Sequence, residues 1–224
     1  TTALPAAQKG ADVTGIDIAA NLVAAGNARA AAAGLANLKF KEGDASNLEN
    51  IGDNAFDLVV SIFGAMFAPR PNEVASEMVR VTKPGGRIVM GNWIPGDPTL
   101  VAQVLKISAA YTPPPPEGFV SPVTWGQEAH VVERFTAAGV SPDNISCRPD
   151  TYTFRYDGPP SEFLARFRNW YGPTMNAFEA ADKDGRADAL QAELEALFNA
   201  QNASGNAATT VIPATYLRVE VTVP

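Results

Sequence analysis

The sequence predicts an α/β protein built around a mostly parallel sheet. Four apolar, strand-like segments occur within the first 93 residues: Asp12–Asp17, Leu38–Glu42, Phe56–Ile62 and Arg87–Asn92. They alternate with helical segments, and this alternation is typical of right-handed βαβ units. Phe56–Ile62 is apolar almost throughout, which favours a parallel strand that is buried on both faces.

Three helical segments accompany these strands. Thr2–Lys9 is expected to be the end of a helix, because a glycine follows it. Asn21–Ala33 is rich in alanine and also ends at a glycine. Asn72–Thr82 carries apolar residues along one side, and Lys83–Gly86 (KPGG) is predicted to stop this helix and turn the chain.

The second half of the chain predicts six further elements. Asp97 as N-cap and Pro98 as first helical residue predict a helix that reaches Tyr111. The others are helices at Trp125–Ala138, Ser161–Trp170 and Asp184–Asn202, the last exposed and charged, and strands at Thr151–Tyr156 and Tyr216–Val223. The final strand alternates and should have one polar face.

Composition excludes several classes of protein. The 224 residues include 17 basic and 24 acidic side chains, for a net charge of −7, and no basic cluster interleaves with aromatics. We therefore expect no nucleic-acid binding, and no apolar run is long enough for stable membrane insertion. Cys147 is the only cysteine, which argues against a disulfide framework or a cysteine-based zinc site and favours the reducing cytoplasm. No metal site is predicted, and a homodimer is left open.

Two neighbouring strands each lead into an aspartate. Asp17 ends the first, and Asp44 follows the second. An ionised carboxylate accepts hydrogen bonds and matches a vicinal diol, and ligands of parallel sheets bind beyond the carboxyl ends of strands. The pattern therefore predicts a nucleoside site. The alternatives are that Asp17 caps the helix that follows and that Asp44 is a turn residue.

Five motifs in this order resemble the class I S-adenosylmethionine-dependent methyltransferases. They are VTGID (Val13–Asp17), EGDA (Glu42–Ala45), FDLVVSIFGAMF (Phe56–Phe67), KPGG and RIVMGNW (Arg87–Trp93). The chain is most similar to the small-molecule branch that includes ubiquinone- and menaquinone-biosynthesis methyltransferases, over about residues 1–93. WGQEA, NWYGPT and IPATYL in the later half are similar to a bacterial subgroup of such enzymes.

The resemblance implies a Rossmann-like, doubly wound and mostly parallel sheet with an antiparallel last strand and helical lid insertions. It implies one domain over residues 1–224, with a cofactor-binding core at 1–93 and substrate or lid helices and the last strands at 94–224. The family's first strand and its acidic-x-Gly-x-Gly-x-Gly loop are absent from this sequence. We therefore expect residues to be missing before Thr1, and the 224 residues alone to be inactive.

The resemblance also implies roles for six residues around S-adenosylmethionine. Asp17 would accept hydrogen bonds from the ribose, and Ile18 would pack on the adenine. Asp44 would accept from the adenine amino group, and the Ala45 N–H would donate to a ring nitrogen. Ser61 and Ile62 would face the methionine part.

The substrate is expected to be a small, partly apolar metabolite that receives the methyl group in line. Five residues are candidates for its pocket, with core packing as the alternative for most of them: Phe63, Met66, Trp93, Trp125 and Tyr171. His130 is the only histidine and a weak candidate for a general base, although it lies within a predicted helix. A dedicated base is not required, because positioning can supply much of the rate in such a transfer.

Two other functions remain open from the sequence. A methyltransferase-like fold can bind a ligand or a partner without catalysis. A strand that ends in Asp17 also suits the ribose of NAD, which would make the protein an NAD-dependent oxidoreductase. The 224 residues contain no G-x-G-x-x-G motif, which argues against the second alternative.

Overall fold

The computed structural model describes residues 2–224, and they form two compact units. Unit 1 runs up to Gly91 and adds Ala129–Ser146 and Val219–Pro224, and unit 2 comprises Asn92–Glu128 and Cys147–Arg218. The expectation of a single domain over residues 1–224 stays a prediction. No helix of the described residues is both long and apolar enough to cross a membrane.

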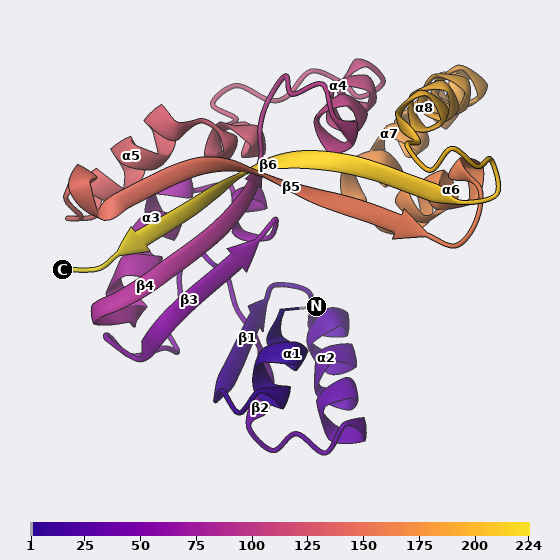
Figure 1. Ribbon diagram of the computed structural model, residues 1–224. Helices are drawn as coiled ribbons and strands as arrows, with labels where there is room; N and C mark the ends of the chain where they lie inside the picture. The colour runs from indigo at the N-terminus through magenta and orange to yellow at the C-terminus, as the bar shows by residue number, and fades with distance from the viewer. Residues whose placement is uncertain (1) are drawn as a thin grey trace. The chain divides into compact units, whose positions relative to one another are not determined.

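Unit 1 begins with a two-stranded parallel sheet. β1 (Val13–Asp17) and β2 (Leu38–Glu42) pair in register, so that Asp17 lies opposite Glu42. α1 (Ala3–Gln8) and α2 (Ala20–Ala32) pack against these strands (Figure 1). The predictions for these four elements are confirmed to within one residue at each end.

Phe40 of β2 holds this small sheet against α2. Its ring fills the space next to Gly15 of β1 and Gly26 of α2. A Cβ at Gly15 would overlap the ring, and one at Gly26 would lie 2.8 Å from two ring carbons. The two glycines therefore let an aromatic ring seat β1, the strand that carries Asp17, close to the helix that follows it.

Four longer strands form a second sheet in the order β3-β4-β6-β5: β3 (Phe56–Ile62), β4 (Thr82–Trp93), β5 (Ile145–Tyr156) and β6 (Thr210–Thr222). β3 and β4 are parallel. The end of β6 lies beside the start of β4, because Gly85 N–H donates to Val223 O at 2.9 Å and Val223 N–H donates to Gly86 O at 3.0 Å. The last strand is therefore antiparallel to β4 (Figure 1). The predicted α/β fold, with a mostly parallel sheet and an antiparallel last strand, is confirmed.

The KPGG segment differs from its prediction. α3 (Pro71–Val81) ends before it as expected, but Lys83–Gly86 lies within β4 as an irregularity of the pairing with β3 and does not form a turn ahead of the strand. Gly85 has φ +76°, and a Cβ at Gly86 would lie 2.8 Å from Lys83 O. These two glycines permit the chain to bulge and still stay in the sheet.

The prediction that β3 is buried on both faces is wrong for these residues. Leu58, Val60 and Ile62 alternate along the strand and are 46%, 39% and 42% exposed. β3 pairs with β4 along one edge, and no strand of residues 2–224 pairs with its other edge. The apolar run therefore lacks the cover that a strand inside a parallel sheet receives.

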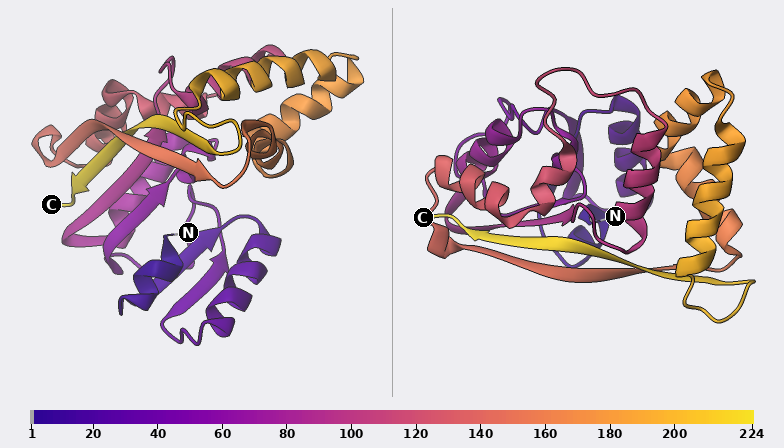
Figure 2. Two further views of the ribbon diagram at one scale, coloured as in Figure 1. Left: turned by 45° about the vertical axis from the view of Figure 1, so that its right-hand side comes forward. Right: turned by 90° about the horizontal axis from the view of Figure 1, so that it is seen from above.

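Unit 2 contains a group of packed helices (Figure 2). They are α4 (Leu100–Ala110), α6 (Pro160–Trp170), α7 (Gly172–Lys183) and α8 (Ala187–Gln201). Phe163 and Phe167 of α6 pack edge to face with each other and with Phe198 of α8, at ring distances of 5.3 to 5.8 Å. Aromatic rings thus form much of the interior between these helices.

Three helix predictions in the second half need correction. α7 was not predicted, because its first residues, Gly172 and Pro173, suggested a turn. α8 was predicted to be exposed, yet it buries Leu190, Leu194 and Phe198 completely. The N-cap of α4 is Thr99, whose N–H donates to Asp97 Oδ1 at 2.8 Å, so the helix begins two residues later than expected.

The remaining elements extend or divide the predicted ones. Trp125 lies in a short 3-10 helix, η2 (Pro122–Gly126), and α5 (Glu128–Ala137) begins after it. A further 3-10 turn, η3 (Pro142–Asn144), leads into β5. β5 and β6 both begin six residues before their predicted starts.

Candidate functional site

Asp17 ends β1 and borders α2. Its Oδ1 accepts a hydrogen bond from the Ala19 N–H at 2.9 Å, one residue before the helix begins. Its Oδ2 has no hydrogen-bond partner within the described chain, so one carboxylate oxygen remains available as an acceptor. The next side chain, Ile18, is 72% exposed. Asp17 therefore orders the start of α2 and still presents a free oxygen beside an exposed apolar side chain.

Asp44 follows β2 and is held by two neighbours. Its Oδ1 accepts from the Ser46 N–H at 2.8 Å and from Ser46 Oγ at 2.7 Å, and its Oδ2 accepts from Arg70 Nη2 at 3.1 Å. Arg70 Nη2 also donates to Ser46 Oγ at 2.8 Å. The hydrogen bonds from Ser46, and then Arg70, hold the pKa of the Asp44 carboxyl below its ordinary value of 3.8. Asp44 is therefore an ionised acceptor at neutral pH.

Ala45 lies between these two polar residues. The Ala45 N–H donates no hydrogen bond within residues 2–224, whereas the next N–H along the chain, that of Ser46, donates to Asp44 Oδ1. Asp44 and Ala45 therefore offer one acceptor and one donor in adjacent positions. The edge of an adenine ring presents the complementary pair, an amino group next to a ring nitrogen.

The carboxyl end of β3 forms a strained turn. Ser61 Oγ accepts from the Ala65 N–H at 2.9 Å, which fixes the start of the 3-10 helix η1 (Ala65–Phe67). Phe63 continues the ladder by donating its N–H to Gly91 O at 2.9 Å, and its φ is +58°. A left-handed phenylalanine is a genuine outlier, and such strain is concentrated at functional sites. Met66 in η1 is buried.

Sequence reasoning missed Arg70 and Ser46. Neither belongs to a motif, and Arg70 lies 26 residues from the carboxylate that it contacts. Arg70 directly precedes the proline that opens α3, and only the folded chain brings it to Asp44. No feature of the sequence predicted this contact.

A polar hollow of about 310 Å³ lies beside the loop that follows Asp44. It is lined by hydroxyl, amide and carboxylate side chains of the loop and of α3: Ser46, Asn47, Asn72, Glu73, Ser76 and Glu77. None of the predicted cofactor or substrate residues borders it. Its polar lining does not suit an apolar acceptor.

Three of the predicted substrate residues belong to unit 2. Trp93 and Trp125 are buried, and the adjacent Gly126 approaches the Trp93 backbone so closely that no Cβ fits there. The Tyr171 hydroxyl is buried and has no partner among the described residues, and burial raises the pKa of this phenol. The six predicted cofactor residues, Phe63 and Met66 all belong to unit 1.

His130 lies on α5 in unit 1 and is partly exposed. Its Nδ1 is 3.5 Å from Glu133 Oε2, one turn along the same helix. Its assignment as a base stays a prediction. In the part of the chain that the structure covers, no group of three or more His, Cys, Asp or Glu side chains could hold a metal ion.

Comparison with known proteins connects this geometry to a family. The model of a methyltransferase domain matches residues 1–90. An uncharacterised protein of Mycobacterium tuberculosis strain H37Rv, Rv1403c, is 36% identical over 198 residues, which cover 87% of this chain and 69% of that protein. A demethylmenaquinone methyltransferase of Paenarthrobacter aurescens is 36% identical over 93 residues, 42% of this chain and 34% of its own length.

Solved structures share the fold at low sequence identity. The YcgJ protein of Bacillus subtilis superposes with a TM-score of 0.60 at 17% identity, over 100% of this chain and 87% of its own. A phosphoethanolamine N-methyltransferase of Haemonchus contortus, solved with S-adenosylhomocysteine, gives a TM-score of 0.55 at 18% identity, over 99% of this chain and 46% of its own. The family model and the curated relatives agree, and the chain therefore belongs to a methyltransferase family whose fold the solved structures share.

Proposed function

We propose that the protein transfers a methyl group from S-adenosylmethionine to a small, partly apolar metabolite. The observation that carries this proposal is the pair of aspartates that follow two neighbouring parallel strands. Asp17 keeps one carboxylate oxygen free, and Asp44 and Ala45 offer an acceptor next to a donor. Membership of the methyltransferase family supports the same reaction.

The residues of unit 1 fit the nucleoside half of the cofactor. Asp17 would accept from the ribose hydroxyls, and Asp44 with the Ala45 N–H would pair with the adenine edge. Ile18 is 72% exposed, and packing against the adenine ring would remove its apolar surface from water. Full burial of such a side chain contributes about 1.5–3 kcal/mol at most to the binding free energy. The methyltransferase of Haemonchus contortus solved with S-adenosylhomocysteine supports this choice of cofactor.

The methionine half has fewer contacts in this sequence. Ser61 and Ile62 would face it, but no acidic-x-Gly-x-Gly-x-Gly loop occurs in the 224 residues. Backbone N–H groups of such a loop, next to a helix N-terminus, favour a charged ligand. We therefore propose that these 224 residues by themselves do not turn over substrate.

The cofactor, when bound, supplies a methyl group already activated by its sulfonium. The chain's part is to hold the acceptor atom in line and to exclude water, which can contribute about 7–11 kcal/mol at best. Phe63 and Met66 of unit 1 would line the substrate pocket, and the pocket roles of Trp93, Trp125 and Tyr171 stay predictions. If the acceptor needs to lose a proton, His130 would remove it, and its partial exposure leaves it free to exchange that proton with water.

The test is a screen of the complete gene product with cofactor labelled in its methyl group. Quinone, phenol, amine and fatty-acid-like acceptors would be compared, with heat-treated protein as the control. We expect label to appear in one of these classes, most readily in quinones or phenols, because the relative from Paenarthrobacter aurescens is a demethylmenaquinone methyltransferase. Binding of the cofactor without transfer to any class would instead favour a non-catalytic binding protein.

The non-catalytic alternative has one observation in its favour. His130, the only histidine, is a partly exposed side chain next to Glu133 on the same helix, as expected of an ordinary surface residue. The other alternative, an NAD-dependent oxidoreductase, is supported only by the suitability of Asp17 for the ribose of NAD. Tighter binding of NAD than of S-adenosylhomocysteine in calorimetry would favour it over methyl transfer.

A further inference from the structure

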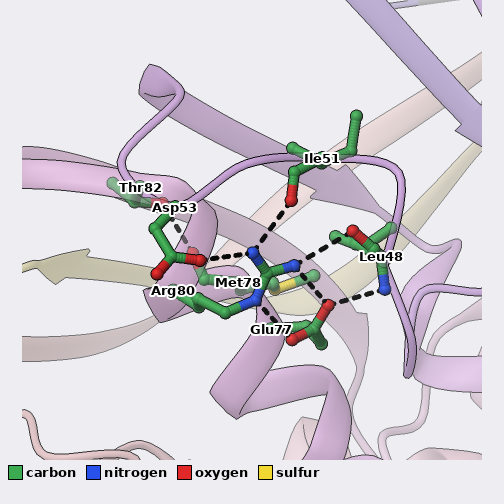
Figure 3. A network of polar contacts seen from close by, with 7 residues as sticks. All are labelled: Leu48, Ile51, Asp53, Glu77, Met78, Arg80 and Thr82. Atoms are coloured by element: carbon green, nitrogen blue, oxygen red, sulfur yellow. Dashed lines mark hydrogen bonds and ion pairs between the residues drawn. The ribbon is translucent and has the colours of Figure 1, made fainter.

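Arg80, in the last turn of α3, uses all five of its N–H donors (Figure 3). Nε donates to Glu77 Oε1 at 2.7 Å, and Nη2 donates to Glu77 Oε2 at 2.7 Å and to Leu48 O at 3.0 Å. Nη1 donates to Ile51 O at 2.9 Å and to Asp53 Oδ1 at 2.7 Å. A guanidinium has five N–H groups in a fixed plane, so this side chain is fully satisfied in one arrangement.

Glu77 completes the arrangement from the same helix. Its Oε2 also accepts from the Leu48 N–H at 2.6 Å, so both backbone polar groups of Leu48 are bound to α3 (Figure 3). The side chains of Glu77 and Arg80 are only 18% and 30% exposed. The Arg80 hydrogen bonds lower the pKa of the Glu77 carboxyl, so the pair is charged at neutral pH. Hydrogen bonds between charged groups in such partly buried positions are the strong ones.

The segment that this pair holds is the connection between β2 and β3. Residues 43–55 contain no helix or strand, and connections of this length without secondary structure are most often functional or disordered. Here α3 fixes the connection at both ends. Arg70 binds Asp44 and Ser46, and the Arg80 N–H donors hold Leu48, Ile51 and Asp53. The Asn54 N–H donates to Arg80 O at 2.9 Å.

We propose that Arg80 is a positioning residue for the cofactor. It keeps the 43–55 connection in the one arrangement in which Asp44 and Ala45 present their acceptor and donor to adenine. This inference rests on the proposed function, and it assigns to the Glu77–Arg80 pair a part in choosing adenine over other bases. Arg80 itself contacts neither ligand nor reacting atoms.

The physical reason is the cost of ordering a loop. Leu48 lies four residues beyond Asp44, so a free Leu48 allows Asp44 and Ala45 to move with it. If the loop occupies the competent arrangement only a fraction of the time, the apparent dissociation constant rises by the inverse of that fraction. A lysine cannot replace the planar fork, because its ammonium is a single point charge.

The experiment compares Arg80→Gln with Lys83→Gln in the complete gene product. Lys83 pairs with Asp57 at the surface, at 2.9 Å, and forms no hydrogen bond or ion pair with residues 43–55. It is therefore a matched loss of one positive charge, and it removes one ion pair where Arg80→Gln removes two. Calorimetry with S-adenosylhomocysteine should show the dissociation constant rise about tenfold for Arg80→Gln, as expected for a loop that is competent about a tenth of the time. Lys83→Gln should bind as the wild type does.

A second ligand separates positioning from general damage to the fold. S-inosylhomocysteine carries a carbonyl in place of the adenine amino group and a proton on the adjacent ring nitrogen. Its donor and acceptor are therefore exchanged relative to adenine, and neither Asp44 nor the Ala45 N–H meets a matching partner. Arg80→Gln should therefore weaken the adenine ligand more than the inosine ligand, and Arg80→Lys should recover only part of the loss. In a protein that already carries Asp44→Asn, adding Arg80→Gln should change the dissociation constant for the adenine ligand little, because both substitutions act on the same contact.

Three outcomes decide the question. If the wild type and Arg80→Gln both bind, and both prefer S-adenosylhomocysteine over S-inosylhomocysteine by the same ratio of dissociation constants, this inference is overturned and the proposed function stands. No binding of S-adenosylhomocysteine by the wild type overturns both. If Arg80→Gln does not fold, judged by circular dichroism, Glu77→Gln replaces it, and an unchanged adenine preference in that variant overturns the inference.

Discussion

At the scale of single residues, Phe63 shows where the backbone stores strain. Its φ of +58° lies in the left-handed region, which costs an L-residue with a Cβ roughly 1–2 kcal/mol. Glycine avoids this cost, although it is ordinarily less stable than alanine by about 0.5–1 kcal/mol in regular structure. Both substitutions remove the phenylalanine ring, so the difference in stability between the glycine and alanine variants reports the cost of the left-handed backbone alone.

Phe63→Gly should be more stable than Phe63→Ala by about 1 kcal/mol. The measurement is urea unfolding of both variants, followed by circular dichroism. The same pair of substitutions at Phe67, four residues along in η1 and without a positive φ, should rank in the opposite order. If alanine is the more stable residue at position 63, the turn after β3 does not have the conformation described.

Glu77 predicts a pH dependence of stability. Its pKa is lowered from its ordinary value of 4.5, chiefly by the hydrogen bond from Arg80. The folded protein therefore binds this proton less readily than the unfolded chain, and the stabilisation is present in full above pH 4.5. It is lost as the pH falls through the lower pKa of the folded state.

Glu77→Gln should remove this part of the acid sensitivity. We expect its free energy of unfolding to be lower than that of the wild type at pH 7, and the difference to shrink as the pH falls below 4.5. Chemical unfolding in a series of buffers from neutral to acid pH measures both curves. Parallel curves for the two proteins would show that the Glu77–Arg80 pair does not form in solution.

At the scale of elements, α2 is seated on the small sheet by the Phe40 ring. Alanine is ordinarily favoured over glycine within a helix by about 1 kcal/mol. At Gly26 the new Cβ would lie 2.8 Å from the Phe40 ring, and overpacking of this kind typically costs 1–3 kcal/mol, so that Gly26→Ala should be destabilising by about 1 kcal/mol. Thermal unfolding measures the change.

The background variant Phe40→Leu supplies the control for this prediction. With a smaller side chain at position 40, Gly26→Ala should become neutral or stabilising, because the overlap is relieved and the helix propensity remains. A loss of stability of the same size in both backgrounds would place its cause outside the Phe40 contact. The result bears on the site, because β1 and α2 meet at Asp17.

Local patterns located most elements of the first half, except that KPGG lies within β4 and β3 is not buried on both faces. They failed at further places in the second half. Short apolar runs located β1 and β2, and alanine content with a terminal glycine located α2, each to within one residue. α7 was missed because Gly172 and Pro173 are turn residues in most contexts, although proline is equally suited to a first helical turn. The charges of α8 concealed the face made by Leu190, Leu194 and Phe198.

The site was predictable only where it follows strand ends. The carboxyl ends of β1, β2 and β3 are visible as apolar runs that stop, and the candidates Asp17, Asp44 and Ser61 follow from them. The contacts of Arg70 and Arg80 were not predictable, because their partners lie between 24 and 32 positions away in the sequence. The one local contact is that of Arg80 with Glu77, three residues earlier. The distant contacts depend on how α3 docks, and no spacing in the sequence encodes that.

At the scale of the whole molecule, the candidate cofactor residues gather in unit 1. Added S-adenosylhomocysteine should therefore slow hydrogen exchange in the peptides that cover Asp17–Ala19, Asp44–Leu48 and Ser61–Phe63. α8, in unit 2, should exchange as before. Mass spectrometry of the complete gene product with and without ligand measures this, and protection confined to unit 2 would contradict the assignment.

The most direct test of the central claim is calorimetry of S-adenosylhomocysteine with the wild type and two aspartate variants. Asp12 is exposed, forms no hydrogen bond or ion pair with residues 2–224 and precedes β1, so Asp12→Asn is the matched control for Asp17→Asn. Hydrogen bonds to a charged group contribute about 1.5–3 kcal/mol, so Asp17→Asn should weaken binding roughly 10- to 100-fold, and Asp12→Asn should leave it unchanged. Wild-type protein that does not bind, or Asp17→Asn that binds as tightly as the wild type, would contradict a cofactor site at the end of β1.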